Sequence, residues 1–453
     1  MSLPEVKDRR AEPGIPETSQ GREMAERFGR RATDKLAQAG AKPPVRASGL
    51  RSSAVLATAI FVLANFCMTF YTPIKFDEFR FPYQGWAWWA FNDLKKTTEV
   101  HNVALLGSSL MVSAVAGVDA NYLNKTLDLS QYHKASYLDD SMHTRFGGKF
   151  NTFNLSVPGQ MPSDAYMTLK GMCATANRPD VVIYGVAPRD FIDSTMAGPA
   201  DTEPFRYLRR LVSIDDIAQG AFRTPIAKLE WFLQNALYMF GHAIDFQLTI
   251  KDAEESIINK LVACPPKGKA FTWWDRIKLI PNYFPGEIRP MAVMTGPISE
   301  KAARERWIDN TAEYRERYKH PDKETYKTQF YFLKKLATFC KKERIELVLI
   351  NMPLTSYNIH LLSPPKYMSF VGDLRLFAFE NSLPFYDMCT PSNYAQNDFH
   401  DSVHLNAYGG KKFFDQLINI MSLSGRLAQR FVLAGKDLER HQAVAETEPT
   451  RVQ

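Results

Sequence analysis

An Asp-x-x-His segment near the C-terminal end of the chain is a candidate source of catalytic side chains. In the stretch DFHDSVHLNAYGGKKF, Asp401 and His404 stand three residues apart, just before a Gly-Gly pair and a helix-like run. Such a pair can supply the carboxylate and the base of a catalytic triad, because the carboxylate fixes the histidine tautomer. It can equally be a turn whose carboxylate caps the following helix. Asn406 is expected to position this loop in either case.

A candidate nucleophile lies in LLGSSLM, residues 105–111. Ser109 follows a short apolar run in a Gly-Ser-Ser turn that opens a helix, where backbone N–H groups and the helix dipole can stabilise an oxyanion. By itself this turn favours simple helix capping by serine. Joined to the Asp-x-x-His segment, it predicts a triad in which His404 faces Ser109 and Asp401 lies behind His404.

The elements that must position these residues read as an α/β domain. Apolar runs alternating with helical stretches predict a doubly wound parallel sheet buried on both faces. In such a sheet, ligands bind at the carboxyl ends of the strands, so Ser109 and the Asp401–His404 loop are expected at one edge. Strands are expected at residues 103–107, 151–156, 180–186, 346–353 and 383–388, and a helix at 330–345.

A large helical insertion is expected between the third and fourth strands, at about residues 192–329. Its stretch 224–246 is strongly apolar but interrupted by charges. It is therefore interpreted as a cap helix, a membrane-lying helix or a partner surface. Residues 265–290 are expected to form an irregular loop.

The N-terminal part predicts a membrane anchor. We expect a disordered cytoplasmic tail at 1–51 and a transmembrane signal anchor at 52–73, which contains eighteen uncharged residues from Ala54 to Tyr71. Eighteen helical residues span about 27 Å, close to a bilayer core. Arg46 and Arg51 before the run favour a cytoplasmic N-terminus and an extracytoplasmic main domain. The alternative is a buried core helix.

The remaining boundaries follow from composition. The aromatic segment 74–99, with three tryptophans, is interpreted either as a membrane-interface segment or as packing against the domain. The α/β domain is expected at 100–434, followed by a flexible C-terminal tail at 435–453.

Charge and cysteine content exclude some functions. Residues 1–51 hold eleven Lys/Arg and seven Asp/Glu of the 56 and 49 in the chain, which leaves 45 basic and 42 acidic residues elsewhere. This balance argues against nucleic acid as a partner. None of the five cysteines forms a CxxC pair, so we expect no metal site and no redox motif. The sequence has no Gly-rich phosphate loop, and no cofactor is expected. Whether the cysteines pair or stay as buried thiols is left open.

The order of motifs resembles the SGNH/GDSL hydrolase superfamily. GSSL matches the nucleophile block, NLSVPGQ the second block and DxxH the last. The resemblance implies that Ser109 is the nucleophile, with Ser108 where GDSL has Asp. It also implies that the N–H groups of Ser109 and Gly159 form the oxyanion hole. The third block departs from the family, because GVAPRDF lacks the expected Asn; Arg189 or Asn154 is the candidate substitute.

The subgroup that the motifs resemble includes the D-alanyl transfer protein of teichoic-acid modification, alginate O-acetylation proteins and bacterial DUF1574-type proteins. This resemblance implies a serine acyltransferase or esterase in a bacterial inner membrane, with its main domain in the periplasm. The implied partners are a membrane-bound O-acyltransferase and an envelope glycan or other hydroxyl acceptor, beside the lipid bilayer. The second hypothesis is a non-catalytic accessory subunit of a membrane complex.

Overall fold

The structure is a computed structural model. It describes residues 53–71, 76–77, 79–82, 84–175, 177–193, 195, 198–261, 293–390 and 393–447. The predicted tail at 1–51 and the predicted loop at 265–290 lie outside the described residues. The chain divides into two compact units, Met1–Tyr71 and Thr72–Gln453, and each is considered by itself.

The first unit contains the helix α2, Ser53–Phe70. Among the described helices it is the one long and apolar enough to cross a membrane. Its single buried residue is Asn65, so α2 does not have the burial of a core helix in a soluble domain. Length and composition make α2 a candidate membrane anchor.

The second unit is built on a five-stranded sheet, and the predicted parallel sheet is confirmed. The spatial order is β3-β1-β4-β6-β7, and every neighbouring pair is parallel. The strand β3 pairs with one edge of β1, and β4, β6 and β7 extend from the other edge. The strand order therefore reverses at β1. The strands are β1 Val103–Gly107, β3 Thr152–Asn154, β4 Val181–Val186, β6 Glu346–Asn351 and β7 Phe385–Asp387.

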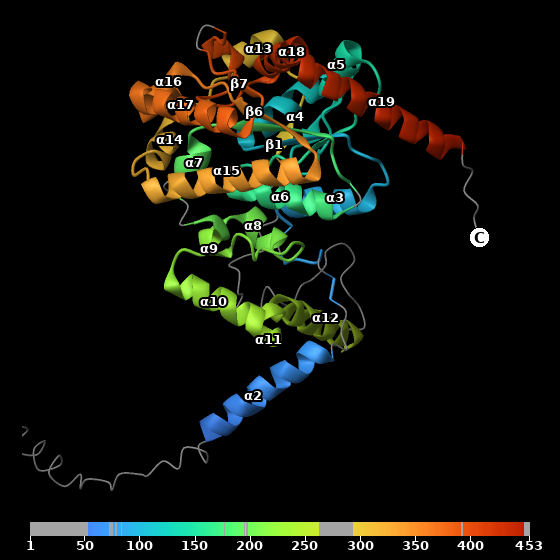
Figure 1. Cartoon of the computed structure of the whole chain (residues 1–453), viewed down its shortest axis with the longest axis vertical. Coiled ribbons are helices and arrows are strands. Elements are labelled where there is room, and N and C mark those ends of the chain that lie inside the picture. The colour runs from blue at the N-terminus through green and yellow to red at the C-terminus, as the bar shows by residue number, and fades with distance from the viewer. Residues whose placement is uncertain are drawn as a thin grey trace, which may run out of the picture. The chain divides into compact units, whose positions relative to one another are not determined.

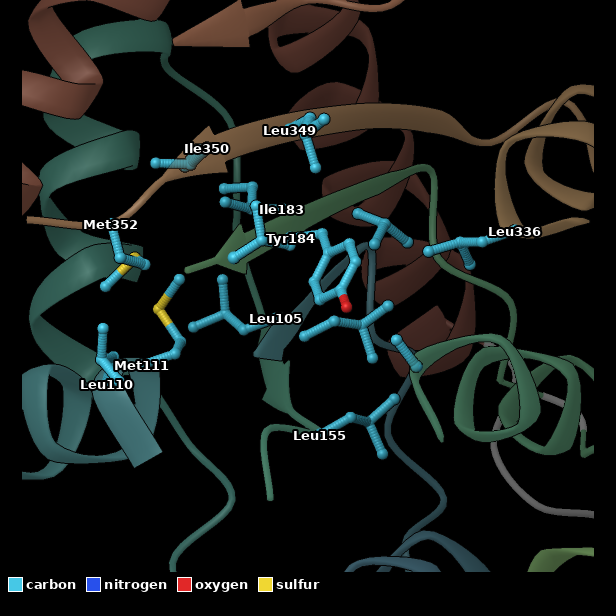
Figure 2. Packing of buried hydrophobic residues seen from close by; sticks show 14 of the residues in the cluster. Leu105, Leu110, Met111, Leu155, Ile183, Tyr184, Leu336, Leu349, Ile350 and Met352 are labelled. Carbon is cyan, nitrogen blue, oxygen red and sulfur yellow. The ribbon is translucent and has the colours of Figure 1, made fainter. Parts of the chain in front are cut away.

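The central strands are apolar on both faces because helices cover both. Every residue of β1 and β4 is buried. Figure 2 shows Met111 and Met352 on one side of the strands, and Tyr184 with Leu336 on the other. The two methionines fill the space over Gly185, where an added Cβ would lie under 3 Å from both side chains. Successive residues of β4 thus face opposite sides of the sheet: Tyr184 contacts the layer on one side, and Gly185 leaves room for the methionines on the other.

Two groups of helices form these layers (Figure 1). The helices of the first group contact one another, and α4 also contacts β1; the group comprises α4 Ser109–Leu123, α5 Ser136–Phe146, α18 Ala407–Leu423 and α19 Gly425–Thr447. The second group covers the other face with α3 Trp86–Lys96, α6 Pro162–Ala174 and α15 Lys323–Glu343. The helices α16 Ser356–Leu362 and α17 Pro364–Asn381 connect β6 to β7.

The predicted insertion is helical, and part of it belongs to the domain core. Phe205, Tyr207 and Leu208 of α8 are fully buried, and so is most of Tyr314 in α14. The strand β5 pairs antiparallel with β2. The elements are α7 Arg189–Ile192, η1 Pro199–Asp201, α8 Glu203–Leu208, α9 Ala218–Ala221, α10 Pro225–Ala236, α11 Tyr238–Gly241, α12 Ala243–Leu261, β5 Met294–Thr295, α13 Glu300–Glu305 and α14 Thr311–Arg317, with β2 at Leu127–Asp128.

The aromatic segment after α2 packs on the domain. Phe91 and Leu94 of α3 are buried, and α3 contacts α6 and α8. The indole N–H of Trp88 donates to the carbonyl oxygen of Phe79 at 2.9 Å. Of the two interpretations of this segment, the structure favours packing on the domain for its helical part.

The predicted boundary of the C-terminal tail is wrong. The helix α19 continues to Thr447 instead of ending near residue 434. Phe431 and Leu438 are buried on one face of α19, and the ring of Phe431 stacks on Phe146 at 4.9 Å. This narrow apolar stripe holds an otherwise polar sequence in a helix.

The cysteines within the described residues are free thiols. They are Cys67, Cys173, Cys340 and Cys389. Cys340 and Cys389 are buried in the core, where cysteine packs as a small apolar residue.

Candidate active site

The first element of the site is the turn between β1 and α4. The strand β1 ends at Gly107, Ser108 is the N-cap residue, and Ser109 is the first residue of α4. The first N–H groups of a helix have no acceptor within the helix and carry its positive partial charge. The local sequence thus places the Ser109 hydroxyl beside donors that can stabilise negative charge.

The three residues predicted as a triad form one hydrogen-bonded chain. His404 Nε2 lies 2.8 Å from Ser109 Oγ. On the other side of the ring, His404 Nδ1 lies 2.6 Å from Asp401 Oδ2. The structure therefore brings Ser109, His404 and Asp401 together in the predicted order.

The Asp401 carboxylate is held in a single orientation. Its Oδ1 accepts the backbone N–H groups of Val403 at 2.9 Å and His404 at 2.8 Å. Burial raises the pKa of Asp401, but the bonds from His404 and Val403 outweigh burial and hold the pKa below its usual value. An ionised Asp401 favours the tautomer in which Nδ1 carries the proton, so Nε2 is free to accept the Ser109 hydroxyl proton.

The loop that carries Asp401 and His404 is closed by backbone and cap bonds. The His400 N–H donates to the His404 carbonyl oxygen at 2.8 Å. Asn406 is the N-cap of α18: its Oδ1 accepts the N–H groups of Tyr408 and Gly409 at 3.0 Å each. The side chain of Asn406 thus ties the loop to the helix that follows it.

The Gly-Gly pair after the loop allows α18 to approach its neighbours closely. A Cβ on Gly409 would lie 2.0 Å from the carbonyl oxygen of Asp398. A Cβ on Gly410 would lie 2.8 Å from Val118 and 3.0 Å from the carbonyl oxygen of Ala114, both on α4. Because α4 begins at the nucleophile, this close contact sets the distance between the two halves of the site.

Gly159 lies in the turn after β3, and this turn is fastened to the nucleophile turn. Gly159 has φ +83°, a conformation that favours glycine. The Val157 N–H donates to the Gly107 carbonyl oxygen at 3.0 Å, and the Gly107 N–H donates to Gln160 Oε1 at 2.7 Å. Gln160 is almost fully buried. The sequence did not indicate that Gln160 links the two turns, although Gln160 is the last residue of the NLSVPGQ motif.

Of the two candidates for the missing Asn, Arg189 is the one whose side chain lies beside Gly159. A Cβ on Gly159 would lie 3.2 Å from Arg189 Nη2. The Arg189 side chain is only 9% exposed, with Nη2 2.8 Å from Asp193 Oδ2. Asn154, at the end of β3, is buried, and its Oδ1 accepts the Ser156 N–H at 3.1 Å within its own turn.

The Asp193 carboxylate holds two arginines near the site. Arg317 Nη1 lies 2.6 Å from Asp193 Oδ2, the same oxygen that binds Arg189. Burial raises the pKa of Asp193, but Arg189, Thr195 and Arg317 together lower it below its usual value. An ionised Asp193 keeps the Arg189 guanidinium in place by a charge-assisted bond.

Sequence reasoning also missed the contribution of α14 and the residues before it. Asn310 Oδ1 accepts the N–H of Ser402 at 3.1 Å and its hydroxyl at 2.5 Å. Ser402 stands between Asp401 and His404, so Asn310 supports the loop from outside.

Tyr314 of α14 is a further buried group near the site. Burial raises the pKa of Tyr314; the charge of Arg189 lowers it and the charge of Asp401 raises it. The charged sequence of this region gave no signal of such contacts.

Comparisons with known proteins add little to this geometry. No protein-family model matches the chain, and no curated protein matches it. Among solved structures, the chain is similar to a crystal structure from Bacteroides fragilis NCTC 9343 that is described as a "putative acylhydrolase". The identity is 12% and the TM-score 0.29, over 73% of this chain and 93% of that chain. A likeness this distant carries no argument, so the chemistry of the site rests on its own residues.

Proposed function

We propose that the chain is a serine-dependent acyl-transfer enzyme of the SGNH type. The observation that carries the proposal is the hydrogen-bonded chain from Ser109 through His404 to Asp401, with distances of 2.8 and 2.6 Å. The strand order of the sheet, which is that of doubly wound flavodoxin-like folds, and the order of the sequence motifs support the SGNH assignment. Ser109 is the nucleophile, His404 the general base and acid, and Asp401 the residue that orients His404.

The proposed reaction has two steps. Ser109 Oγ attacks the carbonyl carbon of an acyl donor while His404 Nε2 takes the hydroxyl proton. The tetrahedral intermediate then expels the donor's alcohol, which leaves with the proton from His404, and the acyl group stays on Ser109. In the second step His404 takes a proton from water or an acceptor hydroxyl, whose oxygen attacks the acyl-serine carbonyl carbon. The second tetrahedral intermediate collapses by breaking the bond to Ser109 Oγ, which receives the proton back from His404, and the carboxylic acid or the new ester is released.

The oxyanion of each intermediate is assigned to the N–H groups of Ser109 and Gly159, with Arg189 as the additional donor. Arg189 supports this role because its guanidinium lies beside Gly159 and is almost fully withdrawn from water. A cation in such a site stabilises developing negative charge more strongly than the same group does in water. Asn154 is proposed as a loop-positioning residue, because its Oδ1 accepts the Ser156 N–H, and Asn406 acts through the loop that carries His404.

The cellular setting is proposed from the N-terminal part of the chain. The helix α2 supports a single-pass signal anchor in a bacterial inner membrane. Arg46 and Arg51 before it favour a cytoplasmic N-terminus and a periplasmic main domain. Within that setting the proposed acceptor is an envelope glycan hydroxyl, and the proposed acyl source is a membrane-bound O-acyltransferase-type protein.

The test is covalent labelling of the full-length chain with a fluorophosphonate probe. The expected result is an adduct on the Ser109 peptide by mass spectrometry, lost in Ser109→Ala and at least about 100-fold slower in His404→Ala. The matched control is Ser113→Ala, one turn further along α4, which should label at the normal rate. Labelling that survives in Ser109→Ala, or folded protein that never labels at Ser109, contradicts the proposal.

A further inference from the structure

The helix α10 carries an apolar face that points away from the domain. Ile226 is 78% exposed, Leu229 57% and Phe232 59%. No residue of this helix is buried. Single exposed apolar residues are common on protein surfaces, but three large ones grouped on one helix form a patch. Such a patch is a candidate interaction surface.

The orientation of α10 is set by its opposite face. Ala227 and Trp231 pack against the domain core, and the Trp231 ring stacks on Phe222 at 6.1 Å. At 100° per residue, this inner side lies across the helix from Leu229 and Phe232. Lys228 and Glu230 fall at the two margins of the outer arc. The exposed arc is therefore wholly apolar and bordered by charge, which is the pattern of a helix lying in a membrane interface.

Phe76, six positions after the end of α2, packs on the segment that follows α10. The helix α2 ends at Phe70, and the Phe76 ring stacks on His242 at 5.0 Å and packs edge-on to Phe246 at 5.4 Å. Six residue steps reach at most about 20 Å. His242 joins α11 to α12, and α11 follows α10 after a single residue, Leu237. If α2 crosses a membrane, Phe76 lies within that reach of the point where the chain leaves the bilayer, and His242 and Phe246 lie one ring contact further.

We propose that the outer face of α10, defined by Ile226, Leu229 and Phe232, lies in the boundary between lipid headgroups and acyl chains. This inference rests on α2 being a membrane span and is independent of the chemistry assigned to Ser109. It makes α10 a second membrane contact beside α2. A domain attached at two places cannot rotate freely about a single tether, so the site at Ser109 keeps a constant orientation to the membrane surface.

The test uses the full-length chain in phosphatidylethanolamine–phosphatidylglycerol vesicles. Cys67, Cys173 and Cys264 are replaced by Ser, and a single cysteine for an environment-sensitive fluorophore is introduced by Leu229→Cys. The matched control is Phe379→Cys on α17, an apolar position that is 84% exposed. Lipids with a nitroxide near the headgroup are expected to quench the probe at 229 at least twofold and to leave the probe at 379 unchanged.

Three outcomes overturn the proposal. The probe at 229 can stay unquenched and open to aqueous iodide, which means that α10 is in water. It can be shielded from iodide without lipid quenching, which means that protein covers α10. Equal quenching at 229 and 379 means that the whole domain lies on the vesicle without a specific face. Fluorophosphonate labelling of Ser109 in the same samples reports separately on the proposed function and on folding.

Discussion

His404 Nε2 lies 2.8 Å from Ser109 Oγ although 295 positions separate the two residues. Ser109 follows the strand β1, and His404 precedes the helix α18, which packs on the helix that Ser109 begins. The contact between α18 and α4 therefore joins the two halves of the site.

Asp401→Asn should lower the rate of fluorophosphonate labelling by about 10³- to 10⁴-fold. An amide at this position no longer fixes the His404 tautomer, so Nε2 loses its ability to accept the Ser109 proton. The rate of probe incorporation measures the effect. Asp398→Asn is the control, because Asp398 caps the same loop at the Ala395 N–H without touching His404. Equal effects of the two variants would assign Asp401 to loop stability alone.

Arg189→Gln should slow acyl transfer to a chromogenic ester by about 100-fold in kcat with little change in KM, because oxyanion donors act mainly in the transition state. Arg189→Lys should restore part of the rate, since it keeps the positive charge. The control is Arg317→Gln, which also removes a partner of Asp193, whereas the atoms nearest to Gly159 belong to Arg189. If Arg317→Gln slows kcat as much as Arg189→Gln, the effect comes from the ion pairs and the oxyanion role is wrong.

Asn310→Ala should lower kcat about tenfold by loosening the loop that carries Asp401 and His404. Two hydrogen bonds from Ser402 lose their acceptor, at a cost of about 1–3 kcal/mol for buried donors. Asn310→Asp keeps an acceptor oxygen and should recover most of the rate. Hydrogen exchange at residues 400–405 checks the mechanism: slow kcat with unchanged exchange would contradict a positioning role for Asn310.

Glu203→Gln should stabilise the fold at pH 8 by about 3 kcal/mol and leave it nearly unchanged at pH 4.5. Burial of the Glu203 carboxyl raises its pKa to about 7 from an ordinary 4.5. Between these values the folded chain holds a proton that the unfolded chain has lost, so this group's contribution to stability falls as pH rises and is fully lost above pH 7. Glutamine cannot ionise, so that loss disappears.

Denaturant unfolding of the full-length chain in detergent at the two pH values measures this difference. Glu300→Gln is the control, because Glu300 lies on the exposed surface of α13, where its side chain is 54% exposed. A stability gain that is the same at pH 4.5 and pH 8 would show that ionisation of Glu203 is not its cause.

Much of the scaffold could be predicted because its signals are local. Parallel strands buried on both faces must be continuous apolar runs, so 103–107 and 180–186 stand out in the sequence and match β1 and β4 closely. The proximity of Ser109, His404 and Asp401 could be predicted because few folds use both a Gly-Ser-Ser turn after a strand and an Asp-x-x-His loop. The helical stretch after residue 434 could not be predicted, because its polar sequence carries one buried large side chain, Leu438, which leaves a weak pattern.

The contacts between segments far apart in the chain have no local signature and are seen only in the folded structure. The choice of Arg189 over Asn154 beside Gly159 depends on how the turn after β3 meets α7 across the sheet edge. The support of Ser402 by Asn310 depends on where the insertion folds back. Residue type and periodicity are local properties, so the candidate catalytic groups and the strands that carry them can be recognised in the sequence. Distances between groups far apart in the chain follow from helix packing, which is a property of the whole fold.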